Sequence, residues 1–312
     1  MLTSLKRVLA AADKGRYAVG AFNINNLEIL RAVIDTAVEL KSPVIIQTSE
    51  GAIEYAGMDY LVAMVRVAAK APVPVVLHVD HGKDLAVIRR AISAGYTSVM
   101  IDASALPYKE NVAKTKKVVG FARPKGVSVE AEIGALAGVE DKVSVSEKEA
   151  FYTDPDEAVR FVRETGCDAL AISIGTAHGP NKSKVTPELD IRRLAKIRRL
   201  VKLPIVLHGA SGIDPTLVKL TQKSCAKLGD CGRLAKAIGI PDDQIRAAIR
   251  NGIRKINIDS DLRLAFTAGM REAVLENHDS IDPRKLLLPS IRLMRQVVAG
   301  KMRLFGSAGK AR

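Results

Sequence analysis

Short apolar runs alternate with longer amphipathic stretches along most of the chain. The short runs are rich in Val and Ile and apolar at nearly every position, which is typical of strands buried on both faces of a parallel sheet. Eight such strands are predicted, at residues 18–22, 44–48, 75–78, 98–102, 127–132, 169–173, 205–208 and 255–258.

Between the strands, apolar residues recur at i, i+3 and i+4, which is the spacing of an amphipathic helix. The pairs Asp154–Pro155 and Thr186–Pro187 supply N-cap and first-turn residues for the last two helices. Strands alternating with helices predict an α/β fold, the (β/α)8 TIM barrel, formed by residues 1–312 as one domain. The six helices predicted lie at 27–40, 60–70, 84–94, 109–121, 156–164 and 188–200.

Two segments are additional to the eight strand–helix units of a minimal barrel. Residues 222–239 form an extended loop before the last strand, and residues 283–303 predict an extra C-terminal helix. Either segment is a candidate for an oligomer interface.

Composition excludes several classes of protein. Hydrophobic residues make up 47% of the chain, enough for one large core, which excludes a disordered protein. No apolar run approaches the roughly 20 residues that span a bilayer, and the first residues lack the pattern of a signal peptide. The 3 cysteines have no CxxC spacing, which argues against a disulfide framework. We therefore expect a cytoplasmic protein with no membrane association.

The formal net charge of +14 favours an anionic partner. Proteins that bind nucleic acid usually combine basic clusters with aromatic residues, whereas aromatic residues make up only 4% of this chain. The basic run at 192–199 has helical spacing and is typical of a solvated helix face. We expect a small polyanion such as a sugar phosphate, and no nucleic acid.

Histidines gather at the carboxyl ends of the predicted strands, where TIM barrels carry their active sites. His81, His178 and His208 follow three different strands. Three imidazoles with an open fourth position are typical of a catalytic Zn²⁺ site, although a single histidine is more often a hydrogen-bonded structural residue. His78 is expected at most to support this site, because strand periodicity points it away from His81.

Carboxylates accompany these histidines. Asp80 precedes His81, which makes it a candidate general acid/base, with the orientation of a histidine as the alternative role. Asp102 and Glu132 offer oxygen ligands for a second or alternative cation, or they cap helices.

The Gly-rich segment 208–214 is a candidate phosphate site. Its glycines let backbone N–H groups approach an anion, and Ser211 adds a hydroxyl. Together with residues 257–260 it follows the last two strands, where barrels often bind phosphate, although Gly/Ser loops usually just turn. The sequence has neither GxxxxGK[ST] nor a GxGxxG that follows a strand, so both nucleotide-binding motifs are missing. No lysine lies at the carboxyl end of a predicted strand to form a Schiff base. Of these reaction types, metal-assisted catalysis is the one that the sequence leaves open.

With these residues placed, the chain resembles class II (metal-dependent) fructose-bisphosphate aldolases over essentially its whole length. The matching motifs are Gly20–Asn26, Leu77–Gly82, Glu130–Gly134, Gly175–Gly179, His208–Gly212, Lys255–Asp261, Asp282–Arg284 and Phe305–Lys310. The resemblance implies reversible cleavage of D-fructose 1,6-bisphosphate to dihydroxyacetone phosphate and D-glyceraldehyde 3-phosphate.

The resemblance also implies roles for single residues. His81, His178 and His208 would hold the catalytic Zn²⁺, Asp80 would exchange the C4 hydroxyl proton, and Glu140 would move a proton at C3. A second divalent cation at Asp102 and Glu132, and a monovalent cation, are further expectations. The substrate-binding residues implied are Asn25, Ser49, Gly179, Lys182, Gly209, Ser211, Asn257, Asp259, Ser260, Arg263, Asp282 and Arg284. The last two resemble residues that a neighbouring subunit supplies, so a homodimer or homotetramer is expected.

Two alternatives stay open. A tagatose-1,6-bisphosphate aldolase would act on the epimer at C4, and Asp259 and Arg263 favour the fructose substrate. A basic, zinc-containing binding protein without catalysis would leave Asp80 and the other polar residues at the strand ends unexplained.

Overall fold

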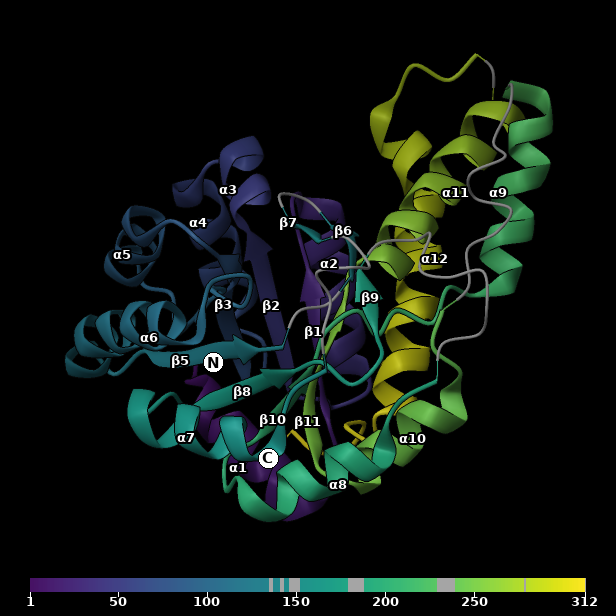
Figure 1. The fold of residues 1–312 in the computed structure, drawn as a ribbon. Coiled ribbons are helices and arrows are strands. Elements are labelled where there is room, and N and C mark those ends of the chain that lie inside the picture. The colour runs from purple at the N-terminus through teal and green to yellow at the C-terminus, as the bar shows by residue number, and fades with distance from the viewer. Residues whose placement is uncertain are drawn as a thin grey trace.

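Eight parallel strands close into a barrel in the order β1-β11-β10-β8-β5-β4-β3-β2 (Figure 1). The computed structural model describes residues 1–134, 137–140, 143–145, 152–178, 188–228, 239–277 and 279–311. The barrel strands are β1 (Val19–Asn23), β2 (Val44–Ser49), β3 (Val75–Gly82), β4 (Ser98–Ile101), β5 (Ser128–Ile133), β8 (Ala169–Ile172), β10 (Ile205–Leu207) and β11 (Ile253–Ile258). The predicted TIM barrel is confirmed, and the first and last barrel strands close it.

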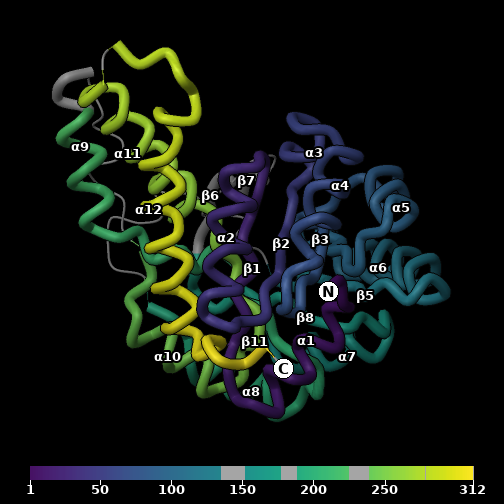
Figure 2. Tube along the Cα trace, turned by 180° about the vertical axis from the view of Figure 1, so that it is seen from behind, coloured from purple at the N-terminus to yellow at the C-terminus, as the bar shows by residue number. Residues whose placement is uncertain are grey.

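Helices cover the outside of the barrel, and a small three-stranded sheet with the order β7-β6-β9 lies apart from it. The helices are α1 (Leu5–Gly15), α2 (Leu27–Glu39), α3 (Glu50–Ala56), α4 (Met58–Ala68), α5 (Leu85–Ala94), α6 (Tyr108–Ala122), α7 (Pro155–Thr165), α8 (Ile191–Leu200), α9 (Pro215–Leu228), α10 (Asp242–Arg250), α11 (Ser260–Glu276) and α12 (Pro283–Leu304). A short 3₁₀ helix (Arg123–Lys125) follows α6, and the small sheet consists of β6 (Ala137–Glu140), β7 (Val143–Val145) and β9 (Ala177–His178). In Figures 1 and 2, α9, α11 and α12 stand together on one flank of the barrel.

All six predicted helices are present, and so is the C-terminal helix, as α12. Asp154 caps α7 as predicted, because its side chain accepts the N–H groups of residues 156 and 157. The start predicted for α8 is wrong: the helix begins at Ile191, because Asp190 caps it by accepting from the Arg193 N–H. The loop predicted at 222–239 is wrong in its first part, since α9 continues to Leu228, and residues 229–238 lie outside the described part. Within the described residues, no helix is long and apolar enough to cross a membrane.

The side chains inside the barrel change from apolar at its amino end to polar at its carboxyl end. At its amino end, Val19, Ile45, Val76 and Val206 form an apolar layer with Leu9 of α1, so α1 plugs this end. Because side chains alternate along a strand, the same inward rows then carry polar residues toward the carboxyl end. That row includes Gln47, His78, Glu130, Lys255 and Asn257, all buried. The larger apolar core lies between the strands and the outer helices.

Asp13 anchors the plugging helix α1 to the barrel. Its carboxylate accepts hydrogen bonds from Arg198 Nη2 at 2.7 and 2.8 Å and from Arg254 Nε at 2.7 Å. Burial raises the pKa of Asp13, but hydrogen bonds and charge from the two guanidinium groups outweigh it, so the pKa lies below its usual value of 3.8.

We expect Asp13→Asn to lower the free energy of unfolding by about 2 kcal/mol at neutral pH, because two arginines lose a charged acceptor. A carboxyl group whose folded pKa is lowered stabilises the protein above its unfolded pKa, and this contribution disappears as the pH falls through the folded pKa. Urea unfolding at neutral pH and again below pH 3.8 measures both effects. The exposed Asp279→Asn is the control, and a deficit that persists undiminished in acid would contradict the assignment.

Candidate active site

The carboxyl end of β3 presents adjacent residues to the same site. Alternation places His78 and Asp80 inside the barrel and would place His81 outside. His81, however, has a φ of +47°, and the ladder between β3 and β4 shifts register between Val79 and Gly82. A positive φ at a non-glycine residue is costly and uncommon. This irregularity brings His81 Nδ1 to 2.8 Å from Asp102 Oδ2.

Imidazole and carboxylate groups converge above the polar interior. His208, after β10, lies with its ring centroid 4.6 Å from that of His81. Glu132 Oε2 lies 3.3 Å from His208 Nδ1 and 3.9 Å from His81 Nδ1. The donor atoms of Asp80, His81 and His208 lie within 4.8 Å of one another, as do those of His81, Asp102 and Glu132. Nitrogen and oxygen donors at this spacing fit a divalent cation of the zinc type.

The charges of the site also fit a bound cation. Burial lowers the pKa of His81, but the carboxylates of Asp80, Asp102 and Glu132 outweigh burial and raise that pKa to about 10. Burial raises the pKa of Asp102, but its hydrogen bond to His81 dominates and holds the pKa far below its usual value. The carboxylates therefore stabilise positive charge inside the barrel. A metal ion would supply that charge in place of the protons that the imidazoles lose.

The third predicted metal ligand, His178, and the glutamate predicted to transfer a proton, Glu140, belong to the small sheet. The backbone of His178 ends β9 and pairs with Gly138 of β6, and Glu140 ends β6. Their side chains lie outside the described part of the structure, as do Gly179 and Lys182 altogether.

Asp80 is held by amide side chains on both of its oxygens. Asn23 Nδ2 donates to Oδ2 at 2.8 Å, and Asn257 Nδ2 donates to Oδ1 at 2.9 Å. Gln47 Nε2 donates to Asn23 Oδ1 at 2.6 Å and so fixes the orientation of that amide. Burial raises the pKa of Asp80, but positive charge at His81 and Lys255 lowers it overall, so the group is held as a carboxylate.

A lysine that the sequence analysis did not consider lies at the centre of the barrel. Lys255 is fully buried, with Nζ 3.0 Å from Glu130 Oε2 and 2.8 Å from Asn257 Oδ1. Glu130 Oε1 in turn lies 2.8 Å from His208 Nε2, so the ion pair supports a predicted metal ligand. Burial and the charge of Lys255 lower the pKa of His78 to about 3. The available clue was that Lys255 shares the inward row of β11 with Asn257.

The predicted substrate-binding residues fall into two groups at the barrel mouth. Asn25, Ser49, Asp259 and Arg263 line one small pocket, within which Arg263 Nε donates to Asp259 Oδ1 at 2.8 Å. The second group consists of Gly209 and Ser211 in the loop after β10, Asn257 near the end of β11 and Ser260 at the start of α11.

Asp282 and Arg284 lie outside both groups. Asp282 caps α12 and accepts from Arg284 Nε at 3.0 Å and Nη2 at 2.9 Å. Figure 1 places the start of α12 at the outer tip of the helical flank, away from the barrel strands. Within one chain, this pair is not brought to the site.

The sequence and the fold both resemble those of known aldolases. The sequence model of the family described as "Fructose-bisphosphate aldolase class-II" matches residues 3–310. The chain is 46% identical to a fructose-bisphosphate aldolase of Thermus caldophilus, covering 100% of both chains. It is 44% identical to a fructose-bisphosphate aldolase of Helicobacter pylori (strain J99), covering 99% of this chain and 100% of that one. The crystal structure of the YdjI aldolase from Escherichia coli K12 superposes with a TM-score of 0.78 at 35% identity, covering 100% of both chains.

Proposed function

Because the chain belongs to the class-II fructose-bisphosphate aldolase family, we propose that it cleaves D-fructose 1,6-bisphosphate reversibly with Zn²⁺ and Asp80. The products are dihydroxyacetone phosphate and D-glyceraldehyde 3-phosphate. The observation that carries the proposal is the position of Asp80: a buried carboxylate, held on both oxygens, beside His81 and His208.

The family implies a divalent metal, and the described donor set fits one. His81 and His208, together with His178, would hold Zn²⁺. When bound, the ion supplies Lewis-acid stabilisation of the negative charge that develops on the ketose fragment as the C3–C4 bond breaks. Asp102 and Glu132 would hold a second divalent cation. A monovalent cation near the substrate completes the proposed set.

Asp80 and Glu140 would carry the proton transfers. In cleavage, Asp80 accepts the proton of the C4 hydroxyl, C4 becomes the aldehyde carbon, and the C3–C4 electron pair passes to the ketose fragment. Glu140 then delivers a proton to C3, and condensation reverses both steps. Asn23 and Asn257 orient the Asp80 carboxylate, and its burial limits competition from water.

The two groups of residues at the barrel mouth would bind the two ends of the bisphosphate. The group of Gly209 and Ser211 would bind the phosphate of the dihydroxyacetone half, and Gly179, Lys182, Asn257 and Ser260 are assigned to the same half. Asp259 is also assigned to this half, although it lines the pocket of the other group beside Arg263, so it would lie where the two halves meet. Asn25, Ser49 and Arg263 would contact the glyceraldehyde phosphate half. The net charge of +14 favours capture of this anion.

The proposal extends to assembly and location. Asp282 and Arg284, distant from the site of their own chain, would reach the site of a neighbouring subunit in a homodimer or homotetramer. Residues 1–312 would act as one catalytic unit, since strands from both ends of the chain close the barrel. We place the enzyme in the cytoplasm, in keeping with the free, buried thiol of Cys167.

Metal analysis combined with a cleavage assay tests the function. Chelation is expected to lower turnover of fructose 1,6-bisphosphate by at least about 100-fold, because Lewis-acid stabilisation contributes several kcal/mol. Adding Zn²⁺ is expected to restore turnover. Full turnover by metal-free protein would refute the mechanism. Equal or faster cleavage of tagatose 1,6-bisphosphate by the same preparation would overturn the choice of substrate.

A further inference from the structure

The loop after β10, which carries His208 and Ser211, is held from beneath by a buried carboxylate of α11. Asp261 Oδ2 accepts the N–H of Gly212 at 2.9 Å, and Oδ1 accepts the N–H of Ile213 at 2.7 Å. The Asp261 side chain is 1% exposed. Its two oxygens therefore fix consecutive peptide groups of the loop.

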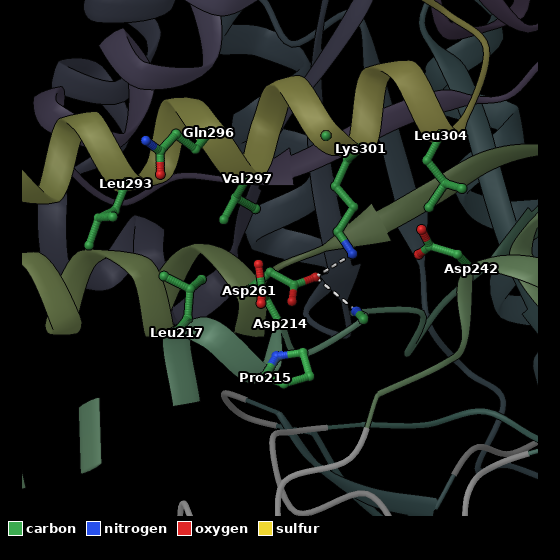
Figure 3. A pocket seen from close by; sticks show the side chains of 12 residues that line it. Asp214, Pro215, Leu217, Asp242, Asp261, Leu293, Gln296, Val297, Lys301 and Leu304 are labelled. Atoms are coloured by element: carbon green, nitrogen blue, oxygen red, sulfur yellow. Dashed lines mark hydrogen bonds and ion pairs between the residues drawn. The ribbon is translucent and has the colours of Figure 1, made fainter. Parts of the chain in front are cut away.

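Helix α12 supplies the charge that balances this carboxylate. Lys301 Nζ lies 3.0 Å from Asp261 Oδ2, and Figure 3 shows the lysine reaching down from α12 toward it. A side chain at Gly212 would place its Cβ 2.6 Å from Lys301 Nζ, so glycine at this position leaves room for the ammonium group. On the other side, the N–H of Ile240 donates to Ser211 O at 3.2 Å. Hydrogen bonds thus fix the loop to α11 and to Ile240, while α12 neutralises the carboxylate of α11.

The loop contains a strained residue next to this contact. Ile213 has a φ of +48°, a left-handed conformation that a β-branched side chain adopts only at a cost. Such a conformation persists where its surroundings hold it in place. The bond from the Ile213 N–H to Asp261 Oδ1 is such a restraint, and the strain shows that the shape of the loop is not its relaxed one.

We propose that Lys301 is a positioning residue for the binding of dihydroxyacetone phosphate. It neutralises Asp261, which holds the loop in the strained shape that presents Ser211 and the Gly209 backbone to the substrate phosphate. The inference rests on the proposed function, which assigns this loop to that phosphate. It also gives the C-terminal helix, outside the minimal barrel, a direct role in the site.

The electrostatic effect of Lys301 is specific to this half of the substrate. Without Lys301, Asp261 would be a buried negative charge beneath a loop that must accept a phosphate dianion. Repulsion and a weakened restraint on the loop would both lower affinity for dihydroxyacetone phosphate. The pocket of Ser49 and Arg263, which is assigned to glyceraldehyde 3-phosphate, has no Lys301 or Asp261 in its lining.

The test compares Lys301→Met with Arg303→Met in the condensation direction, varying the two triose phosphates separately. Both changes remove one positive charge from the last turn of α12, but Arg303 is exposed and does not line the cleft beneath the loop. We expect Lys301→Met to raise the KM for dihydroxyacetone phosphate by about tenfold, equivalent to about 1.4 kcal/mol. The KM for glyceraldehyde 3-phosphate should stay unchanged, and Arg303→Met should change neither.

Two further variants separate charge from general loosening. Lys301→Arg keeps the positive charge and has room, because Lys301 lies in a cleft of about 420 Å³ between α9, α10, α11 and α12, so it should retain a KM near that of the unmodified enzyme. Asp261→Asn combined with Lys301→Met removes both charges and should recover part of the lost affinity. Calorimetric titration of the metal-loaded protein with dihydroxyacetone phosphate alone repeats the comparison without turnover, because no aldehyde is present to condense with it.

The outcomes distinguish the two proposals. An unchanged KM for dihydroxyacetone phosphate in Lys301→Met, or an equal rise in both KM values, would overturn the role of Lys301. An unmodified enzyme that cleaves no bisphosphate would refute the proposed function, and the calorimetric comparison would then decide the role of Lys301 alone.

Discussion

Asp80→Asn is expected to lower kcat for cleavage of fructose 1,6-bisphosphate by about 10³-fold, the range typical of a lost general acid/base. The amide has nearly the same shape as the carboxylate but cannot accept the C4 hydroxyl proton. Because Asp80 lies beside His81 and His208, metal content must be measured in the same preparation. We expect the metal to be retained and the KM to change much less than kcat.

The exposed Asp84→Asn is a matched control for this experiment. Asp84 follows Asp80 closely, caps α5 by accepting from the Ala86 N–H, and can be replaced by Asn, an equally good N-cap. Its kcat should equal that of the unmodified enzyme. An Asp80→Asn enzyme with full metal content and undiminished kcat would remove Asp80 from the mechanism and leave the binding-protein alternative in its place.

Much of the barrel was predictable because its determinants are local. Buried parallel strands are apolar at nearly every position, as in 44–48 and 75–78, and amphipathic helices repeat every three to four residues. The carboxyl ends of parallel strands meet at one edge, so the sequence also predicted that His81 and His208 would converge. The structure brings these two rings together.

Other features depend on contacts between distant segments and were not predictable. Alternation along β3 points His81 outward, and only the bulge against β4 turns it toward Asp102. No sequence pattern gives Asp261 its role, because its partners Gly212 and Lys301 come from other parts of the chain. The start of α8 was misplaced because Asp190 caps the helix there, and residues 186–187, the predicted cap and first turn, lie outside the described part of the chain.

The buried ion pair of Lys255 and Glu130 affects both the stability of the fold and the position of a predicted metal ligand. Lys255 follows Arg254 in the sequence, and such a basic pair is easily taken for surface residues. Its partner Glu130 lies far away in the sequence, and both side chains are fully buried. Glu130 also lies 2.8 Å from His208 Nε2, so the pair links the core of the barrel to the metal site. A change at Lys255 should therefore affect both.

We expect Lys255→Met to lower the free energy of unfolding by about 3–5 kcal/mol, because Glu130 would remain as a buried charge without its ion-pair partner. Urea unfolding of the metal-free protein measures this loss without a contribution from metal binding. Zinc affinity should fall by roughly 10- to 100-fold, since Lys255 would no longer fix the position of the Glu130 carboxylate that orients the ring of His208. The exposed Lys70→Met controls for loss of a positive charge.

The double variant Lys255→Met with Glu130→Gln separates the unpaired charge from the loss of packing. Gln keeps a carbonyl oxygen that can accept from His208 Nε2 but carries no charge, so most of the lost stability should return. If the double variant were as unstable as Lys255→Met, the lysine would act by filling space in the barrel. If Lys255→Met cost no more than Lys70→Met, the ion pair would contribute nothing to the fold, and support of His208 would rest on Glu130 alone.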